Sequence, residues 1–491
     1  MRLMAPGTVM DGFVVGECLH AGGMAQIYQV GYADAARAVP FPLVMKVPRM
    51  TPGDGAENIV GFEVELLLLS VLTGPHVPRL VAAGDLEKLP YLVMEYIPGR
   101  TLQQLLDEAG APLPAEEIAR LGAAVAQAVH SLHLQDACHL DLKPANVLVR
   151  PDGRVVLLDF GLSRHAHYPD LLAEELRPAV GSPTWMAPEQ VVGVRGDPRS
   201  DIFAIGVMLY ELATHELPFG NPQTRGGLRQ RLWMDPAPPR ALRPDLPEWL
   251  QEVILHCLQN EADRRYASAA HLALDLSDPQ QIAVTGLGRR LRPVGFWGHF
   301  KRWLRAAGKD YQPSPLPSRQ IDAAPIVMVA VPYLDVSDVT LYSLRRAVMR
   351  VLGTTPRARL TCVTVIDPAT TPGHDSQTSE TTVHRRYLGM LRQWAQPLQL
   401  DSQTVSFHVI ESGDVAQALL HYAQGNHVSM IVMGAATHGL QMQRLLATVP
   451  IKVAMAAPCT VILVKQALPF EQLANEEAAQ PTLAGINASM V

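Results

Sequence analysis

Cysteine is scarce in this 491-residue sequence, and its placement excludes two structural roles. None of the five cysteines belongs to a Cys-x-x-Cys pair; they are Cys18, Cys138, Cys257, Cys362 and Cys459. An odd number of scattered cysteines is typical of reduced thiols, and it argues against a disulfide framework or a zinc site. We therefore expect mostly buried, unpaired thiols.

Long apolar runs and a strong charge of one sign are also missing. The longest apolar candidate, IFAIGVMLYELA at 202–213, is shorter than the ~18 residues that a membrane-spanning helix needs. The N-terminal MRLMAPGTVMDGF lacks a basic region followed by an apolar run, so no secretory signal is expected. A net charge of −6 argues against nucleic-acid binding by the whole chain. These absences predict a soluble, cytoplasmic protein.

Changes in composition divide the chain into several parts. The length exceeds what one hydrophobic core usually holds, so two or three domains are expected. Short β-branched runs fill 9–97 around one helical segment, and helical periodicity dominates 101–275. The stretch from Pro279 to Lys309 contains no acidic residue, and the Pro-rich QPSPLPSRQ follows it. We predict a domain over 9–276 and a basic, Pro-rich linker over 277–322.

Apolar strands alternate with helices over the remaining ordered part, 323–466. The expected strands are APIVMVAVPYL, RARLTCVTVID, TVSFHVIES, VSMIVMGAA and CTVILVK, and the helices between them are expected at 336–352, 381–398, 414–424 and 440–455. This alternation predicts an α/β domain with a parallel sheet. Residues 467–491 are predicted to form a disordered tail.

Three polar residues interrupt the apolar stretch ACHLDLKPANVLV at 137–149. They are Asp141, Lys143 and Asn146, and such groups are costly in an apolar setting unless paired or used. Asp159 follows the apolar VVLL and precedes Phe160 and Gly161. Two carboxylates, an amide and lysines are the groups that phosphoryl transfer requires. One aspartate orients the hydroxyl, the amide and second aspartate bind Mg²⁺, and lysines neutralise phosphate charge.

Two earlier features could handle phosphate as well. Gly22 and Gly23 lie between strand-like segments and would let the backbone approach a phosphate, although adjacent glycines also suit a simple hairpin turn. Lys46 lies in the apolar LVMKVP, and Glu65 in FEVELLLLSVL is a candidate partner. Each could equally face solvent.

Taken in order, these segments resemble the eukaryotic-type protein kinases, and specifically the bacterial serine/threonine kinases. The resemblance runs over 9–276 and includes the hinge MEYIPG, GSPTWMAPE at 181–189, DIFAIG at 201–206 and ADRRY. It implies an α+β two-lobed kinase fold that uses ATP and Mg²⁺. Lysine at the second position after the catalytic aspartate favours a serine or threonine acceptor.

The resemblance also implies a role for each matching residue. Asp141 would be the catalytic base, and Lys143 would contact the γ-phosphate. Asn146 and Asp159 would bind Mg²⁺. Lys46 would hold the α- and β-phosphates through its ion pair with Glu65. The other residues implied in ATP binding lie in the glycine-rich loop and the hinge: His20, Ala21, Gly22, Gly23, Met24, Glu95 and Ile97.

Structural roles and two departures complete the comparison with that family. Glu189 would form a structural pair with Arg265, and Asp201 would brace the catalytic loop. His20 replaces the glycine that usually opens the glycine-rich loop and Ala25 replaces its third glycine, which implies slower or weaker ATP binding at most. Leu140 replaces the arginine that grips a phosphorylated activation loop, so control by loop phosphorylation is not expected.

The segment 323–466 resembles the universal stress protein domain, which has a Rossmann-like fold. Nucleotide-binding members carry G-x-x-G-x₉-G-[S/T], whereas here Gly434 is followed by Thr437, Ala447 and Thr448, and Pro332 replaces an aspartate. Each lost glycine adds a Cβ where the backbone would approach phosphate. A regulatory or dimerising module is therefore favoured over nucleotide binding, with homodimerisation through the last strand.

The basic linker has an aromatic helical pattern with two interpretations. Its apolar residues recur at helical spacing with Lys301, Arg302 and Arg305 between them; they are Phe296, Phe300, Trp303 and Leu304. Such a helix could lie on an anionic membrane surface. Docking onto the kinase domain, with the arginines solvated, is the favoured interpretation.

The sequence thus predicts an ATP- and Mg²⁺-dependent serine/threonine protein kinase that acts in signal transduction and autophosphorylates. The alternative is a catalytically silent pseudokinase scaffold that binds nucleotide or protein partners. The intact catalytic groups argue against it. A phosphotransferase for small molecules is a third possibility. The APE motif and the long activation loop argue against that one, because they form a docking surface for peptides.

Overall fold

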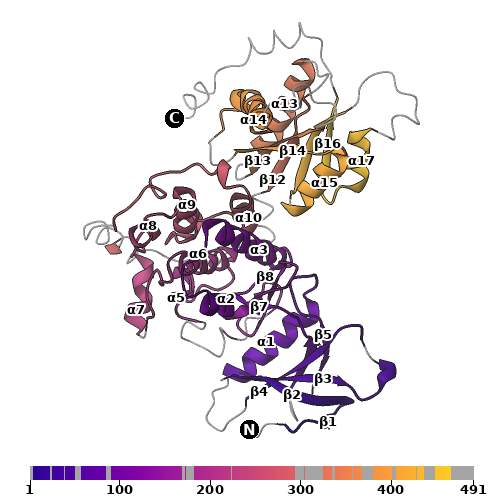
Figure 1. Ribbon diagram of the computed structural model, residues 1–491, viewed down its shortest axis with the longest axis vertical. Coiled ribbons are helices and arrows are strands. Elements are labelled where there is room, and N and C mark those ends of the chain that lie inside the picture. Colours follow the sequence, from indigo (N-terminus) through magenta and orange to yellow (C-terminus); the bar gives the residue numbers. More distant parts are fainter. Residues whose placement is uncertain are drawn as a thin grey trace, which may run out of the picture. The chain divides into compact units, whose positions relative to one another are not determined.

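The computed structural model divides into two compact units, 1–322 and 323–491 (Figure 1). The structure describes residues 4–22, 25–37, 39–49, 57–84, 90–168, 172, 182–222, 224–293, 303–304, 325–333, 338–355, 358–367, 380–400, 405–426, 428–435 and 448–465.

An antiparallel sheet with one helix beside it opens the first unit (Figure 1). The strand order in the described part is β1-β2-β3-β4-β6-β5, with β1 (Val9–Met10), β2 (Phe13–Ala21), β3 (Ala25–Tyr32), β4 (Leu43–Pro48), β5 (Leu80–Ala83) and β6 (Leu92–Glu95). Met45 packs into the core on one face, and Val44 packs on the other face with Phe62 of α1 (Glu57–Val71). Since side chains alternate along a strand, Lys46 lies on the same side as Val44, toward α1.

The second lobe of this unit is mainly helical. Its longer helices are α2 (Leu102–Ala109), α3 (Ala115–His133), α6 (Pro198–Thr214), α9 (Glu248–Cys257) and α10 (Ala269–Ser277). Short helices α5 (Pro188–Val191), α7 (Arg225–Arg229) and α8 (Pro239–Leu242) lie among them. Helix α6 is buried around nearly its whole circumference, which explains why its sequence is apolar on every side. The predicted α+β, two-lobed architecture is confirmed.

Small β-elements connect the helical lobe to the loops of the candidate site. The two sheets consist of β7 (Arg100–Thr101), β9 (Val147–Val149) and β10 (Val155–Leu157), and of β8 (Ala137–Cys138) with β11 (Arg164–His165). Strand β9 pairs with β10 in antiparallel register, Val147 facing Leu157. This hairpin places the residues just before β9 close to those just after β10.

Beyond α10 the chain returns along α9 as a strap, which we define as 282–290. The Gln251 side chain, fully buried in α9, donates from Nε2 to the carbonyls of Leu287, Gly288 and Arg290 at 2.8, 2.9 and 2.8 Å. The neighbouring Glu252 carboxylate accepts the backbone N–H groups of Thr285 and Gly288, at 2.9 and 2.7 Å. Part of the segment predicted as a linker therefore packs on the helical lobe.

The rest of that linker is described at only two positions. Trp303 and Leu304 are exposed, and the remaining residues of the aromatic basic pattern lie outside the described residues. Across the described part of the chain, no helix is both long enough and apolar enough to span a bilayer.

The second unit contains a parallel sheet covered by helices. Its described strands have the order β14-β13-β12-β15-β16, with β12 (Ile326–Ala330), β13 (Arg359–Ile366), β14 (Val405–Glu411), β15 (Met430–Gly434) and β16 (Thr460–Val464). Helices α13 (Asp338–Thr354) and α14 (Glu380–Ala395) lie on one face, and α15 (Val415–Gly425) and α17 (Val449–Ala456) on the other (Figure 1). The predicted parallel α/β fold is confirmed, and β16 lies at the edge of the sheet as far as the structure describes it.

Candidate active site

The Lys46 ammonium is shared by two carboxylates. Its Nζ lies 2.6 Å from Oε2 of Glu65 in α1 and 2.9 Å from Oδ1 of Asp159, just after β10. Glu65 is buried, whereas Asp159 keeps 39% of its side chain exposed. The three side chains thus come from a strand, a helix and a loop far apart in sequence, and one carboxylate of the set remains open to a ligand.

Electrostatics fixes the charge on this cluster. Burial opposes the charged form of Lys46, but Glu65 and Asp159 outweigh it and raise the lysine pKa above its ordinary value. In turn, Lys46 lowers the pKa of Asp159 against the opposing effect of burial. At neutral pH Lys46 is therefore a cation and Asp159 an anion, the states needed to bind phosphate and a divalent metal.

Two glycines let α1 approach the loop that carries Asp159. A Cβ added to Gly61 would lie 3.3 Å from the carbonyl oxygen of Gly161, and one on Gly161 would lie 3.1 Å from that of Gly61. Both distances are shorter than ordinary contacts of a Cβ. Sequence reasoning missed Gly61, although an isolated glycine inside an apolar helical pattern is a signal of close packing.

The catalytic loop brings its three polar residues together. The Asp141 carboxylate contacts Lys143 Nζ at 2.9 Å and Asn146 Nδ2 at 3.3 Å through Oδ2, and accepts the Ser182 N–H at 2.8 Å through Oδ1. Lys143 also lies 2.9 Å from the Ser182 hydroxyl. Asp141 is 6% exposed. The activation segment is thus anchored beside Asp141, and that side chain is fixed in orientation.

The Asp201 carboxylate in α6 binds the backbone of this loop. Its Oδ2 accepts the N–H of His139 at 2.9 Å, and its Oδ1 accepts the N–H of Leu140 at 2.8 Å. Leu140 has φ of 63° and its carbonyl accepts Gln190 Nε2 at 2.8 Å. The predicted bracing by Asp201 is confirmed. This bracing stabilises Leu140 in a left-handed backbone conformation that leucine rarely adopts.

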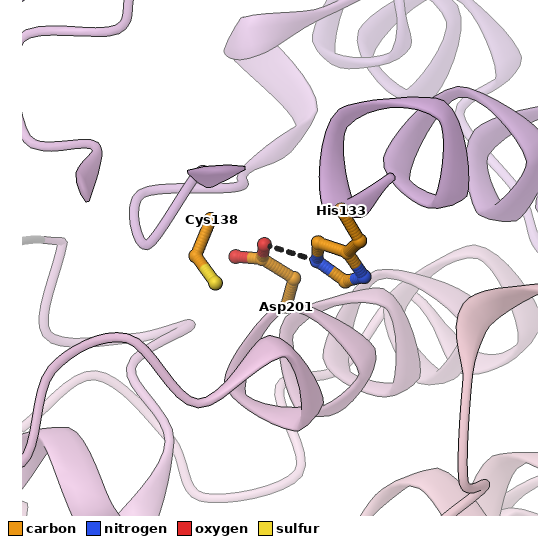
Figure 2. A group of neighbouring side chains, drawn as sticks. All are labelled: His133, Cys138 and Asp201. Atoms are coloured by element: carbon orange, nitrogen blue, oxygen red, sulfur yellow. Dashed lines mark hydrogen bonds and ion pairs between the residues drawn. The ribbon is translucent and has the colours of Figure 1, made fainter. Parts of the chain in front are cut away.

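The same aspartate belongs to a buried trio that has donor types found in metal centres. The ligand atoms of His133, Cys138 and Asp201 lie within 4.8 Å of one another (Figure 2). His133 Nε2 is 2.9 Å from Asp201, whose oxygens also accept two backbone N–H groups. Burial, followed by nearby carboxylates, raises the pKa of Cys138 well above its ordinary value, so the thiol stays protonated. This trio therefore fits a structural brace and does not fit a metal ion.

The predicted glycine-rich loop is described on its strand side only. His20 and Ala21 end β2, and Gly22 donates its N–H to the Ala25 carbonyl at 3.0 Å. A Cβ on Gly22 would lie 2.9 Å from His20 Nε2, so the His20 side chain would have to move if a larger residue replaced Gly22. Gly23 and Met24 lie outside the described residues.

The hinge residues lie where the two lobes meet. Glu95 ends β6 and accepts a hydrogen bond from Arg150 Nη2 at 3.0 Å, which ties it to the segment after β9. Ile97 is 6% exposed and packs with Leu148 and Val156 of the β9–β10 hairpin. Contact between these two residues and ATP remains a prediction.

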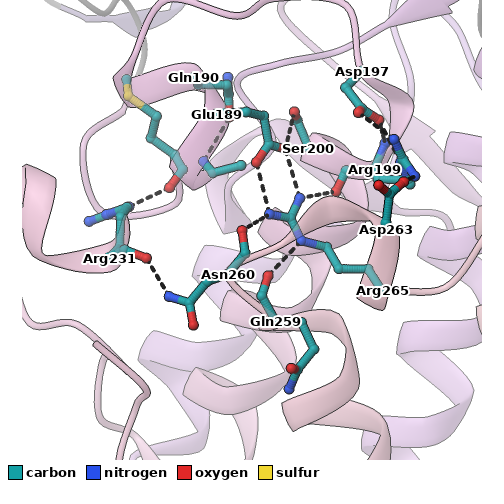
Figure 3. A network of polar contacts seen from close by, with 12 residues as sticks. Glu189, Gln190, Asp197, Arg199, Ser200, Arg231, Gln259, Asn260, Asp263 and Arg265 are labelled. Atoms are coloured by element: carbon teal, nitrogen blue, oxygen red, sulfur yellow. Dashed lines mark hydrogen bonds and ion pairs between the residues drawn. The ribbon is translucent and has the colours of Figure 1, made fainter. Parts of the chain in front are cut away.

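A buried ion pair anchors the far end of the activation segment. Arg265 Nη1 and Nη2 donate to the two Glu189 oxygens at 2.7 and 2.8 Å, and the guanidinium also reaches the carbonyls of Gln259, Arg199 and Asn260 (Figure 3). Arg265 is fully buried, and its predicted pairing with Glu189 is confirmed. Nε, Nη1 and Nη2 of Arg265 therefore all donate to acceptors, which offsets the cost of burying this charge.

Comparison with known families identifies both units. Residues 17–275, just over half of the chain, match the protein kinase domain family. The chain belongs to the protein kinase family. Residues 327–465 of the same chain match the universal stress protein family. Both predicted family resemblances are therefore confirmed, and the first unit contains the kinase domain.

Curated relatives of this kinase include bacterial serine/threonine-protein kinases. It is 28% identical over 260 residues to a probable one from Clostridium perfringens, which covers 53% of this chain and 37% of the relative. It is 29% identical over 278 residues to the serine/threonine-protein kinase PknB of Mycobacterium tuberculosis, which covers 56% of this chain and 44% of the relative. The match thus spans less than half the length of these relatives.

Proposed function

We propose that the kinase domain is an active enzyme that transfers the γ-phosphoryl group of ATP to serine or threonine hydroxyls of proteins. The observation that carries this proposal is the completeness of the site. Lys46 is held by Glu65 and Asp159, while Asp141 is held by Lys143 and Ser182. Catalysis of phosphoryl transfer depends mainly on positioned charges of this kind.

Oxygen ligands for Mg²⁺ are available in this arrangement. Asp159 is an exposed carboxylate whose pKa Lys46 lowers, and Asn146 donates its Nδ2 to the Asp141 carbonyl at 3.0 Å, which leaves its Oδ1 as an acceptor. Hard oxygen ligands from a carboxylate and an amide suit Mg²⁺. When bound, the metal would neutralise charge on the phosphates, and Lys46 would hold the α- and β-phosphates beside it.

Asp141 would accept the proton of the substrate hydroxyl. Its carboxylate is oriented by the Ser182 N–H and by Lys143. Lys143 carries a positive charge next to this carboxylate, where it would stabilise negative charge on the transferred phosphoryl group. No group of this set is replaced, which supports an active kinase over a silent scaffold.

Transfer of radiolabelled phosphate by the full chain tests the proposal. Wild type is compared with Asp141→Asn and with Asp245→Asn, an exposed aspartate that serves as the matched control. Loss of a general base lowers rates by about 10²–10⁴-fold, so Asp141→Asn should lose most incorporation while the control keeps it. Phosphoamino-acid analysis should find phosphoserine or phosphothreonine. Equal incorporation by wild type and Asp141→Asn would instead support the scaffold.

We also propose that the universal stress protein domain forms a homodimer through β16. This strand has a single neighbour in the described sheet, β15, so its other edge can pair with another chain. Such pairing would bring two kinase domains together for reaction in trans. Sedimentation of the full chain should show a dimer, and a monomer at high concentration would refute this proposal.

A further inference from the structure

Arg231 is a buried cation that has no carboxylate partner within the described residues. It lies in the short η3 helix (Gln230–Leu232) and is 1% exposed. Burial alone lowers its pKa to about 10. Its Nε and Nη2 have no hydrogen-bond partner in the part of the chain described. Arg265, equally buried, differs because Glu189 neutralises it.

Such a residue is unfavourable for stability. A buried charge without a counter-ion destabilises the folded state, and apolar replacements at such sites are often neutral or stabilising. Residues that break a folding rule in this way are expected where function requires them. The contacts of the Arg231 guanidinium indicate what that function is.

Arg231 supports the backbone of the activation segment just before the APE motif. Its Nη1 donates to the Met186 carbonyl and, at 3.4 Å, to the Thr184 carbonyl, while the ring of Phe219 lies 5.4 Å from its Cζ. The Arg231 carbonyl in turn accepts Asn260 Nδ2 at 2.6 Å (Figure 3). The backbone of Arg231 is therefore anchored by Asn260, and its guanidinium holds the two carbonyls that flank Trp185.

This supported segment borders the position of the substrate hydroxyl. Ser182 contacts both Asp141 and Lys143, and the Trp185 N–H closes a turn onto the Ser182 carbonyl at 3.1 Å. An extended peptide advances about 3.3 Å per residue. The residues next to a hydroxyl presented to Asp141 would therefore lie within reach of 182–186.

We propose that Arg231 is a positioning residue for the protein substrate. By holding the carbonyls of Thr184 and Met186, it gives 182–186 the shape that receives the residue next to the acceptor hydroxyl. This inference rests on the proposed kinase function. Arg231 contacts neither Asp141 nor Lys46, so its loss should impair peptide binding and leave ATP binding unchanged.

The test measures the KM values of the full chain for peptide and for ATP. The peptides are serine and threonine libraries randomised at the positions beside the acceptor. Arg231→Met removes the charge and the donors but keeps the length of the side chain. Arg229→Met, an exposed arginine two residues earlier, is the matched control. Charged hydrogen bonds to two carbonyls are lost, so the peptide KM should rise about tenfold. The KM for ATP and ATP hydrolysis without peptide should match wild type.

Three further readouts separate positioning from mere structural support. Arg231→Met should unfold at the same or a higher temperature than wild type, because a buried charge is removed. Arg231→Lys should recover part of the peptide affinity, and the library should show weaker selection at the position next to the acceptor in Arg231→Met. An unchanged peptide KM, or equal increases in the KM values for peptide and ATP, overturns the inference.

Failure of the kinase proposal itself would be visible separately. If wild type transfers no phosphate, binding of the same peptides is measured by fluorescence anisotropy. Arg231→Met must then still weaken peptide binding about tenfold relative to wild type and Arg229→Met. Equal binding by all three proteins would refute the role of Arg231 whatever the catalytic activity.

Discussion

The contact between Gly61 and Gly161 predicts a substitution that separates stability from activity. Gly61 lies one helical turn before Glu65, whose carboxylate is 2.6 Å from Lys46. In Gly61→Ala the new Cβ would be 3.3 Å from the Gly161 carbonyl oxygen, so the helix and the loop must separate by a few tenths of an ångström. The same movement displaces Glu65 from Lys46 and Lys46 from Asp159.

The substitution should have opposite effects on thermal stability and on the rate of phosphate transfer. Alanine is favoured over glycine in a helix by about 1 kcal/mol, so the kinase domain should unfold at an equal or higher temperature. A misplacement of 1 Å in an active site can cost about 10²-fold in rate, so a few tenths of an ångström should cost about fivefold. Gly61→Leu, which needs a larger displacement, should lose about 10²-fold.

Two measurements on the full chain separate these effects. Initial rates of phosphate transfer at saturating Mg²⁺-ATP report activity, and thermal unfolding reports stability. Gly389→Ala is the matched control, because Gly389 lies inside α14 with no atom within 4 Å of its added Cβ. It should gain helix stability without any change in rate. Wild-type transfer rates in Gly61→Leu would show that this close approach does not position Lys46, and the reasoning would be wrong.

Three other properties can be tested directly. Glu189→Gln leaves the buried Arg265 charge unpaired, and the free energy of unfolding in urea should fall by about 3–5 kcal/mol; a loss under 1 kcal/mol would contradict this. Burial raises the pKa of the Cys138 and Cys257 thiols above the ordinary 9.0, so the unfolded chain releases protons that the folded chain keeps. The unfolding temperature should therefore decrease as the pH rises above 9, and less so in Cys257→Ala; equal pH profiles would refute this assignment. Gln251→Leu removes three hydrogen bonds to the strap, and hydrogen exchange near Gly288 should accelerate at least tenfold, whereas unchanged protection would show that the strap is held by other contacts.

Much of the fold could be predicted because local patterns and long-range pairs agree with each other. Alternating apolar strands and helices give the parallel sheet of the second unit directly. In the kinase domain, the pairing of Glu189 with Arg265 follows from the family resemblance, since each residue lies in a short motif. Both predictions rely on features that are visible within a few residues of sequence.

The role of Arg231 has no comparable sequence signal. Arg229 and Arg231 lie two residues apart, where the short helix α7 changes to η3, and Arg229 is exposed whereas Arg231 is buried. A break in helical periodicity removes the basis for telling which side chain faces inward. Arg231 faces inward because it donates to the distant carbonyls of Thr184 and Met186. Every residue has a backbone carbonyl, so the sequence does not show which carbonyls will act as acceptors.

The strap was also predicted incompletely, for a related reason. Its sequence between 282 and 290 shows neither strand alternation nor helical spacing, so it resembles a linker. It is held mainly through its own backbone, by Gln251 and Glu252, which would be expected on the exposed side of a helix. Docking that depends on backbone groups cannot be read from side-chain patterns.

The strap gives the end of the kinase unit a mechanical property. Arg290 Nη1 contacts the Asp235 carboxylate at 3.0 Å, and Asp235 lies four residues after Arg231. A pull on the chain just beyond Arg290 would therefore act on Asp235, as well as on α9 through the bond from Gln251 to the Arg290 carbonyl. Part of that force would reach the Thr184 and Met186 carbonyls through the segment between Asp235 and Arg231, without passing through Lys46 or Asp159.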